Sequence, residues 1–393
     1  MADWRSPFTQ AEFDRRLALV RSRMDRAGVD VLVIADPSNM AWLTGYDGWS
    51  FYVPQAAVVE RSGPPLWWGR RQDVAGALRT VWMEPGRCVG YPDILVQNPP
   101  RHPVEDLGRR LADMGHGSAR IGVEADNYYW SARAQAVLAD RLPSARLVDA
   151  TGLVNRCRTV KSAEELGLMR KAARISERLV GLAIDLAEPG LPKNRLIAQV
   201  MAAGIEGTED QWGDYPAIVP LAPSGSDAAA PHLTWNGEPL RAGEATFFEL
   251  SGCVRRYHAP LCRTVHLGPA PDHMKRAADA LVAGLEAGLA AARPGNRARD
   301  VANALAAELE KAGIRRADRC GYPVGLSYPP DWGERTISFR AEDDTPLEAG
   351  MTFHFMPGLW MDDWGLEITE TILVREDGPA EPLAQFPRKL FER

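Results

Sequence analysis

Phe247-Phe248-Glu249-Leu250-Ser251-Gly252 closes a run of three short motifs that begins with Ala217-Ile218-Val219-Pro220 and continues with Pro231-His232. The run contains a histidine, His232, and a carboxylate, Glu249, which are the residue types most used in general acid–base catalysis. A single histidine and a single glutamate are more often incidental than catalytic. The flanking sequence therefore has to decide whether these two belong to a site.

The composition limits the kinds of protein that this chain can be. Its 393 residues suffice for two domains with sizeable cores. A net charge of −6 argues against nucleic acid as a partner, and no apolar run approaches the length of about 20 residues that a membrane span needs. The five cysteines are scattered without a Cys-x-x-Cys pair, and no secretion signal is visible. We therefore expect a cytoplasmic protein with reduced thiols.

The first 155 residues predict a mixed α/β domain. Phe13, Leu17, Val20 and Met24 recur at helical spacing within residues 8–27. A short buried strand follows at 29–34 and ends at the turn signal Asp36-Pro37. Further strands at 56–59 and 121–124 alternate with helical stretches at 104–114 and 131–142.

Residues 156–393 predict a second domain, which opens with a helix. Ser162 followed three residues later by Glu165 forms a capping box, the usual signature of a helix start. Two more helices are expected at 274–292 and 299–312. The segment 351–374 is expected to form two strands joined by a turn at Pro357-Gly358.

The three motifs, together with Arg263-Thr264, resemble the creatinase/prolidase/methionine aminopeptidase family. In metal-dependent members, Asn-x-Ala-x-Pro-His leads into a strand carrying Asp-x-Gly, and a second Asp follows in Ser-Asp-x-Thr-Arg-Thr. The segments 39–46 and 161–166 are similar to further motifs of that family. The resemblance implies a creatinase/prolidase-type α/β domain in residues 1–155 and an α+β pita-bread catalytic domain in residues 156–393.

Two-metal members of the family draw five ligands from Asp, Asp, His, Glu and Glu. The corresponding positions here carry Glu249, Pro260, Tyr322, Met356 and Thr369. Only Glu249 is a ligand type for a hard divalent cation. We therefore expect neither a metal nor another cofactor.

A cleft that lacks metals suits a substrate carbon that is already electron-poor. Metals polarise neutral carbonyls, whereas an amidinium carbon carries positive charge before catalysis begins. Opposite charges about 4 Å apart gain roughly 4 kcal/mol at an effective dielectric constant of 20. Aromatic rings also attract cations. Glu367 is the expected counter-charge for such a cation.

Long runs at 36–52, 213–220, 230–235, 325–336 and 365–370 are similar to those members of the family that hydrolyse the cyclic amidine ectoine. This closer resemblance implies opening of the ectoine ring to N-acetyl-L-2,4-diaminobutyrate, without a metal. It leaves open whether hydroxyectoine is accepted and whether a deacetylase binds as a partner.

Under this hypothesis, Glu249 attacks the amidinium carbon or acts as general base for water, and His232 protonates the leaving ring nitrogen. In creatinase-like dimers the loop at the position of Trp49 and Tyr52 reaches into the neighbouring active site. A homodimer with sites completed in trans is therefore expected. The expected substrate-binding residues are Trp49, Tyr52, Tyr322, Trp332, Trp360 and Glu367.

Three other functions remain open at this stage. The chain could be a metal-dependent dipeptidase acting on Xaa-Pro, or a non-catalytic small-molecule-binding protein with a pita-bread fold. A creatine-type amidinohydrolase is a further alternative, weakened because the glutamate that precedes Arg-Thr in those enzymes is Cys262 here.

Overall fold

The structure is a computed structural model that describes residues 4–316 and 318–393. The chain forms two compact units, Met1–Cys157 and Arg158–Arg393. The boundary predicted from the sequence, between residues 155 and 156, lies within the short helix α6 (Asn155–Arg158). Each unit is described by itself.

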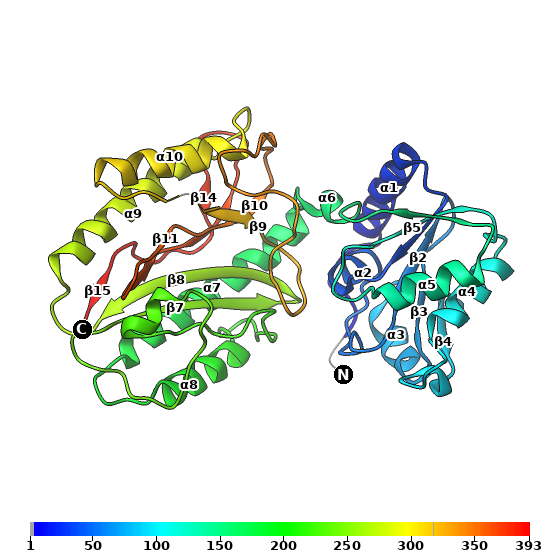
Figure 1. Ribbon diagram of the computed structural model, residues 1–393, viewed down its shortest axis with the longest axis horizontal. Helices are drawn as coiled ribbons and strands as arrows, with labels where there is room; N and C mark the ends of the chain where they lie inside the picture. The colour runs from blue at the N-terminus through cyan, green and yellow to red at the C-terminus, as the bar shows by residue number, and fades with distance from the viewer. Residues whose placement is uncertain (1–3, 317) are drawn as a thin grey trace. The chain divides into compact units, whose positions relative to one another are not determined.

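The first unit is built around a six-stranded mixed sheet with the strand order β4-β3-β2-β1-β5-β6 (Figure 1). Central strand β1 pairs antiparallel with β2 and parallel with β5. All four residues of β1 are buried, as expected for a strand covered on both faces. The strands are β1 (Val31–Ile34), β2 (Ala56–Glu60), β3 (Leu66–Arg70), β4 (Cys88–Tyr91), β5 (Arg120–Val123) and β6 (Arg146–Asp149).

Five helices accompany this sheet, and the expected amphipathic stripe is present in the first of them. Phe13, Leu17, Val20 and Met24 are all buried. Asp36 is not part of a turn, as its pairing with Pro37 had suggested, but caps the N-terminus of α2 by accepting from two backbone amides. The helices are α1 (Gln10–Ala27), α2 (Pro37–Thr44), α3 (Val74–Thr80), α4 (Val104–Asp113) and α5 (Ala132–Arg141).

The second unit is organised by α7 (Ala163–Leu186) and the hairpin of β7 (Ala245–Val254) and β8 (Tyr257–His266). The capping box of Ser162 and Glu165 starts α7, as predicted. The helix crosses the hairpin so closely that a Cβ on Gly252 would lie 2.2 Å from the carbonyl oxygen of Ala172. The Gly252 amide donates to Ser176 Oγ at 2.8 Å. Only glycine fits at this crossing, and the crossing fixes the helix on the hairpin.

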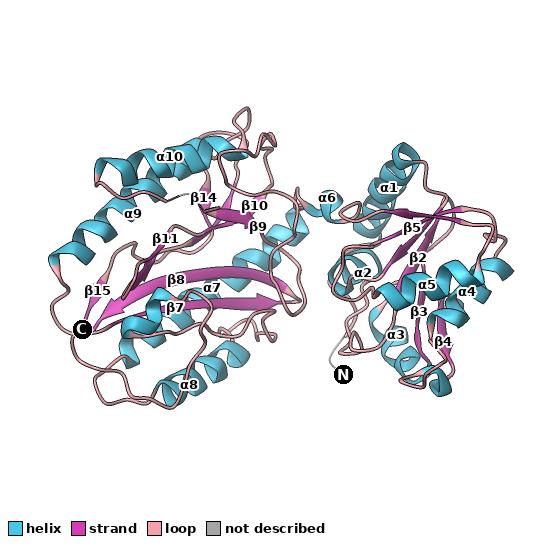
Figure 2. Ribbon diagram, in the orientation of Figure 1, coloured by secondary structure: helices cyan, strands magenta, loops and turns pink. Residues whose placement is uncertain are grey.

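The rest of the second unit adds a four-stranded sheet of order β14-β13-β10-β9, a two-stranded ribbon of β11 and β12, and β15 beside β8 (Figure 2). Helices α9 and α10 share an apolar core with these strands. The helices are α8 (Lys193–Glu206), α9 (Asp272–Ala291) and α10 (Ala298–Lys311), with a 3-10 turn η4 (Gly225–Ala229). The strands are β9 (Gly321–Pro323), β10 (Thr352–Phe355), β11 (Gly358–Trp360), β12 (Gly365–Glu367), β13 (Glu370–Leu373), β14 (Glu381–Pro382) and β15 (Phe391–Glu392).

The prediction of two strands in 351–374 was wrong, because this segment forms the four strands β10, β11, β12 and β13. The polar turn around Asp362 and Asp363 folds β11 back onto β12. This additional hairpin places Trp360 and Glu367 on the two strands of one ribbon.

Across the described ranges, 4–316 and 318–393, no helix combines the length and the apolar character needed to cross a membrane.

Candidate active site

Glu249 lies in the middle of β7, directly opposite Cys262 on β8. Both strands are buried along their whole length. The Glu249 side chain is only 9% exposed and therefore places a carboxyl group inside the second unit.

Glu367 supplies a second buried carboxyl group beside the first. It ends β12, where it is paired with Gly358 of β11, and is 1% exposed. Neither of its oxygens has a hydrogen-bond partner that meets ordinary geometry among the described residues. Burial raises the pKa of the Cys262 thiol well above its usual value, and the charges of both glutamates and a weak thiol contact with Glu367 raise it further.

These two carboxyl groups resist ionisation together. Burial raises the pKa of Glu249 well above its usual value, and the charge of Glu367 raises it further. Burial also raises the pKa of Glu367, to about 7, against the opposing effects of the Cys262 thiol and the Arg316 guanidinium. Near neutral pH the two carboxyl groups therefore hold at least part of a proton between them. A cation that enters the site would favour release of that proton.

A neutral imidazole borders the pair. His354 on β10 has its Nδ1 3.8 Å from Glu249 Oε1 and 3.0 Å from the hydroxyl of Tyr322 on β9. Its Nε2 is 2.9 Å from Thr369 Oγ1. Burial lowers the pKa of His354 to about 3, helped by the charge of Arg319. The ring is therefore uncharged, and its two hydrogen bonds hold its orientation.

Trp332 completes this group by donating from its indole Nε1 to the Tyr322 hydroxyl at 2.8 Å. Burial raises the pKa of Tyr322 well above its usual value, and the charge of Glu249 adds to the effect. Tyr322 thus stays protonated and can donate to His354 while it accepts from Trp332. A hydrogen-bonded chain runs from Trp332 through Tyr322 to His354, next to Glu249.

Comparison with known proteins places this arrangement in a family. Residues 167–376 match Metallopeptidase family M24, and residues 16–160 match the Creatinase/Prolidase N-terminal domain. The chain belongs to the M24 family. It is 55% identical to the ectoine hydrolase of Halomonas elongata over 392 residues, which cover 98% of each chain. It is 37% identical to an uncharacterized hydrolase/peptidase of Sinorhizobium fredii over 385 residues, again with 98% of each chain covered.

Solved structures of M24 proteins share the fold with this chain. The dipeptidase PepE of Mycobacterium ulcerans superposes with a TM-score of 0.80 at 23% identity, over 98% of this chain and 99% of that chain. The prolidase of Thermococcus sibiricus superposes with a TM-score of 0.83 at 17% identity, over 97% and 99%. The predicted fold class, an α/β domain followed by a pita-bread domain, is confirmed.

Metal-dependent family members raise the question of whether these residues fit a pair of metal ions, and they do not. Of the five positions that correspond to ligands, only Glu249 carries a carboxylate, while Pro260, Tyr322, Met356 and Thr369 offer no anionic or imidazole donor. Within the described part of the chain, no three His, Cys, Asp or Glu side chains are grouped so as to hold a metal ion.

Four of the eight predicted site residues lie in the cluster itself: Glu249, Tyr322, Trp332 and Glu367. A fifth, Trp360, lies next to it, because its ring and the stem of Glu367 both border the open face of Gly358. The Trp332 ring is 1% exposed, so it acts through Tyr322 rather than as a free face for a cation.

The other three predicted residues are exposed. His232 lies in the loop after η4, and its side chain is open to solvent. Trp49 and Tyr52 belong to the first unit, where they are 58% and 59% exposed. The Tyr52 hydroxyl accepts from Arg70 at 3.2 Å, and the Trp49 ring packs against Phe51. Their roles remain predictions.

Sequence reasoning missed His354 and Arg316. His354 lies in the short run Thr352-Phe353-His354-Phe355 without a catalytic motif around it. The alternation of the strand would have placed it on one face, but only the pairing of β10 with β9 puts it opposite Tyr322. Arg316 lies in the loop before β9, where no pattern distinguishes it from Arg315.

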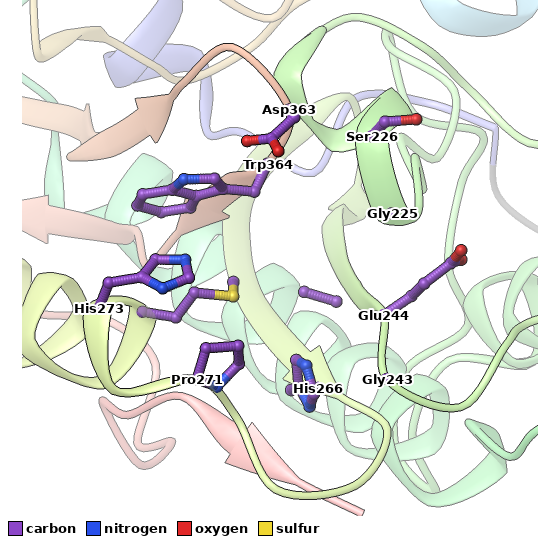
Figure 3. A pocket seen from close by; sticks show the side chains of 11 residues that line it. Gly225, Ser226, Gly243, Glu244, His266, Pro271, His273, Asp363 and Trp364 are labelled. Atoms are coloured by element: carbon purple, nitrogen blue, oxygen red, sulfur yellow. The ribbon is translucent and has the colours of Figure 1, made fainter.

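A surface pocket of about 620 Å³ lies elsewhere in the second unit, and neither Glu249 nor Glu367 lines it (Figure 3). Trp364 and His273 lie together along one side of it, with their ring centroids 5.2 Å apart. Because His273 covers part of this indole, Trp364 is packed against protein and is not part of the carboxyl site.

Proposed function

We propose that this chain hydrolyses the cyclic amidine ring of ectoine to an N-acetylated 2,4-diaminobutyrate, in ectoine breakdown and without a metal ion. The observation that carries the proposal is the buried pair Glu249 and Glu367, held in an M24 fold in which four of the five ligand positions carry non-ligands. The relationship to the ectoine hydrolase of Halomonas elongata supports the choice of substrate.

Charge complementarity explains why such a pair suits this substrate. The ectoine ring is an amidinium, and its central carbon is electrophilic without a Lewis acid. Two carboxyl groups in a site that excludes water attract this cation far more strongly than they would in solvent. As the cation enters, its charge lowers the pKa values that burial had raised, so Glu249 becomes a carboxylate in contact with its target.

The chemistry then follows one of two routes. In the first, Glu249 attacks the amidinium carbon and forms an acyl adduct that water later cleaves. In the second, Glu249 removes a proton from water, and the hydroxide adds to that carbon. In both, one ring C–N bond breaks, the departing nitrogen takes up a proton, and the carbon ends as the carbonyl of an acetamide.

His354 and Tyr322 would position an uncharged imidazole beside Glu249 during these steps. The neutral imidazole, 3.8 Å from Glu249, adds no positive charge that would compete with the substrate cation. Tyr322 occupies the position of a histidine ligand in metal-dependent relatives, and here its hydroxyl orients the imidazole instead.

The remaining predictions belong to the same proposal. His232, on a solvent-exposed loop, would protonate the leaving nitrogen when the loop closes over the ring. Trp49 and Tyr52 would complete the site of a second copy of the chain in a homodimer. The protein would act in the cytoplasm, where a deacetylase could take its product onward as a partner.

The direct test is to incubate the purified protein with ectoine and identify the product by mass spectrometry and NMR. The expected product has gained one water and carries a free amine and an acetamide. The Glu249→Gln variant, which keeps the shape of the side chain, should give none. Wild-type protein that leaves ectoine intact but cleaves Xaa-Pro dipeptides would refute the proposal.

A further inference from the structure

Three side chains in one corner of the second unit have buried polar atoms without hydrogen-bond partners, although Arg316 and Trp360 are only partly buried as residues. They are Arg316, through its Nε, Trp360, through its indole Nε1, and Glu367, through both carboxyl oxygens. An unsatisfied buried polar group costs about 1–3 kcal/mol, so native proteins seldom leave several together. Two of these groups are donors and one is an acceptor, which is the arrangement expected around a ligand with both an anionic and a cationic end.

The local backbone brings these groups side by side. Trp360 and Gly358 lie two residues apart on β11 and so share a face, and Gly358 is paired with Glu367 on β12. A Cβ on Gly358 would lie 2.8 Å from the Trp360 ring and 3.3 Å from Cγ of Glu367. Glycine at this position therefore lets the indole and the stem of Glu367 pack side by side over the strand.

Arg316 reaches the same corner from the loop before β9. Its guanidinium carbon is 5.3 Å from the centroid of the Trp360 ring. Nη1 donates to the carbonyl of Met356 at 3.4 Å and Nη2 to that of Arg319 at 3.1 Å, while Nε is buried without a partner. Arg316 and Glu367 interact electrostatically, but they form no ion pair within 4.0 Å. The two charges are thus near enough to interact without forming a direct ion pair.

We propose that Arg316 and Trp360 bind the carboxylate of the substrate, opposite the carboxyl pair that receives its amidinium. This inference rests on the proposed function, because ectoine carries one carboxylate on its ring. Arg316 Nε–H and Trp360 Nε1–H are the two donors, and the guanidinium charge balances the anion. The contact would select amidines that carry an acid group and would fix which ring atom faces Glu249.

Three other donors near the carboxyl pair interact with groups other than Glu367. Arg319 and Arg335 line a pocket of about 270 Å³ together with Tyr322 and Asp331, and both arginines act to lower the pKa of the Asp331 carboxyl group. The Tyr322 hydroxyl is bound to Trp332 and His354. Arg316 therefore offers the better receptor for a carboxylate next to Glu367.

The test compares two substrates: ectoine, and 2-methyl-1,4,5,6-tetrahydropyrimidine, which is the same ring without its carboxylate. Wild-type protein should have a much higher kcat/KM for ectoine. Arg316→Met should lower kcat/KM for ectoine about 100-fold, the size expected when one partner of a buried charge pair is removed. It should lower kcat/KM for the decarboxylated ring far less, because that ring has no group for Arg316 to bind and loses only the effect of Arg316 on the pKa of Glu367.

Two further variants separate recognition from folding. Trp360→Phe keeps the ring but loses its N–H, so a loss of about tenfold is expected on ectoine alone, as for a single hydrogen bond to a charged group. Arg315→Met removes an exposed arginine one residue away and should leave kcat/KM unchanged for both substrates. Circular dichroism melts establish that each variant is folded.

Each outcome has one reading. Selective loss on ectoine, with the decarboxylated ring far less affected, supports the proposal. A folded Arg316→Met variant that loses activity equally on both rings overturns it, because a positioning effect on the catalytic residues would explain that result. Wild-type protein that opens the ring of neither compound overturns the proposed function itself, whatever Arg316 does.

Discussion

Two arginine–glutamate couples in the second unit, Arg263 with Glu370 and Arg316 with Glu367, differ in how many of their hydrogen-bonding groups have partners. Arg263 on β8 uses its guanidinium fully: it donates to Glu370 Oε1 at 2.5 Å and to the carbonyls of residues 262, 369, 386 and 387. Arg316 makes two longer bonds and leaves Nε unused. Glu370 pairs with two arginines through Oε1 and leaves Oε2 without a partner, whereas Glu367 forms no ion pair through either oxygen.

The contrast separates a couple that stabilises the fold from a couple that we propose binds substrate. Arg263 ties β8 to β13 and to the C-terminal segment, so its bonds are complete without a ligand. The Arg316–Glu367 corner is incomplete in the same kind of surroundings, and a zwitterionic substrate would complete it. Four variants and one treatment test this contrast.

The largest effect on activity is expected from replacing Glu249, which lies beside Glu367. Glu249→Gln should lower kcat for ectoine by at least about 1000-fold, because the amide can neither attack carbon nor accept a proton from water. The melting temperature of this variant should equal or exceed that of wild type. The reason is that burial disfavours the charged form of Glu249, and the amide of glutamine carries no charge. Steady-state kinetics and thermal melts are the measurements. Retention of more than a few per cent of the rate would remove Glu249 from the mechanism.

Arg263→Met should have the largest effect on stability. Removing one partner of a buried ion pair costs about 3–5 kcal/mol, and Glu370 would keep only its 3.2 Å contact with the partly exposed Arg388. Arg316→Met removes only two long hydrogen bonds and should cost about 1 kcal/mol. Urea unfolding followed by circular dichroism compares the two. Equal losses would mean that Arg316 is as structural as Arg263, and the contrast would fail.

This distinction also marks how far sequence alone could go. The capping box at Ser162 and the stripe through Phe13 and Met24 depend on residues within one helix, so local spacing predicts them. The Glu249 position follows from a motif. His354 and Arg316 depend on partners from other strands and loops, and such pairing leaves no local trace.

The β11–β12 ribbon shows the same limit on the scale of an element. A short polar turn at Asp362-Asp363 sits between apolar residues, and the whole segment had looked like one strand after Pro357-Gly358. Because the hairpin was missed, Trp360 and Glu367 were predicted as separate site residues. Their placement around Gly358 appears only when the two strands are paired.

A smaller effect is expected on the pH dependence of stability. The pKa of Glu367 is raised from 4.5 to about 7 by burial. Between those values the folded state holds a proton that the unfolded state has released, so stability falls as the pH rises and levels off above about 7. Glu367→Gln should therefore melt at a higher temperature than wild type at pH 8, and the difference should shrink towards pH 5. A difference that is constant with pH would show that Glu367 is ionised at low pH, as at a surface.

The smallest effect, none at all, is expected from chelation. Extended treatment with EDTA should leave kcat/KM for ectoine unchanged, and added manganese should not raise it. The reason lies in how the ligand positions are used here: Thr369 Oγ1 and the Tyr322 hydroxyl both bind His354, and Pro260 has no side-chain donor. A metal-dependent M24 dipeptidase, assayed in parallel on its own substrate, shows that the treatment strips metal. Loss of ectoine hydrolysis on chelation, with recovery on manganese, would mean that Glu249 and Glu367 bind a cation of the protein's own. The unsatisfied corner would then be a metal site, and the contrast with Arg263 and Glu370 would need a different explanation.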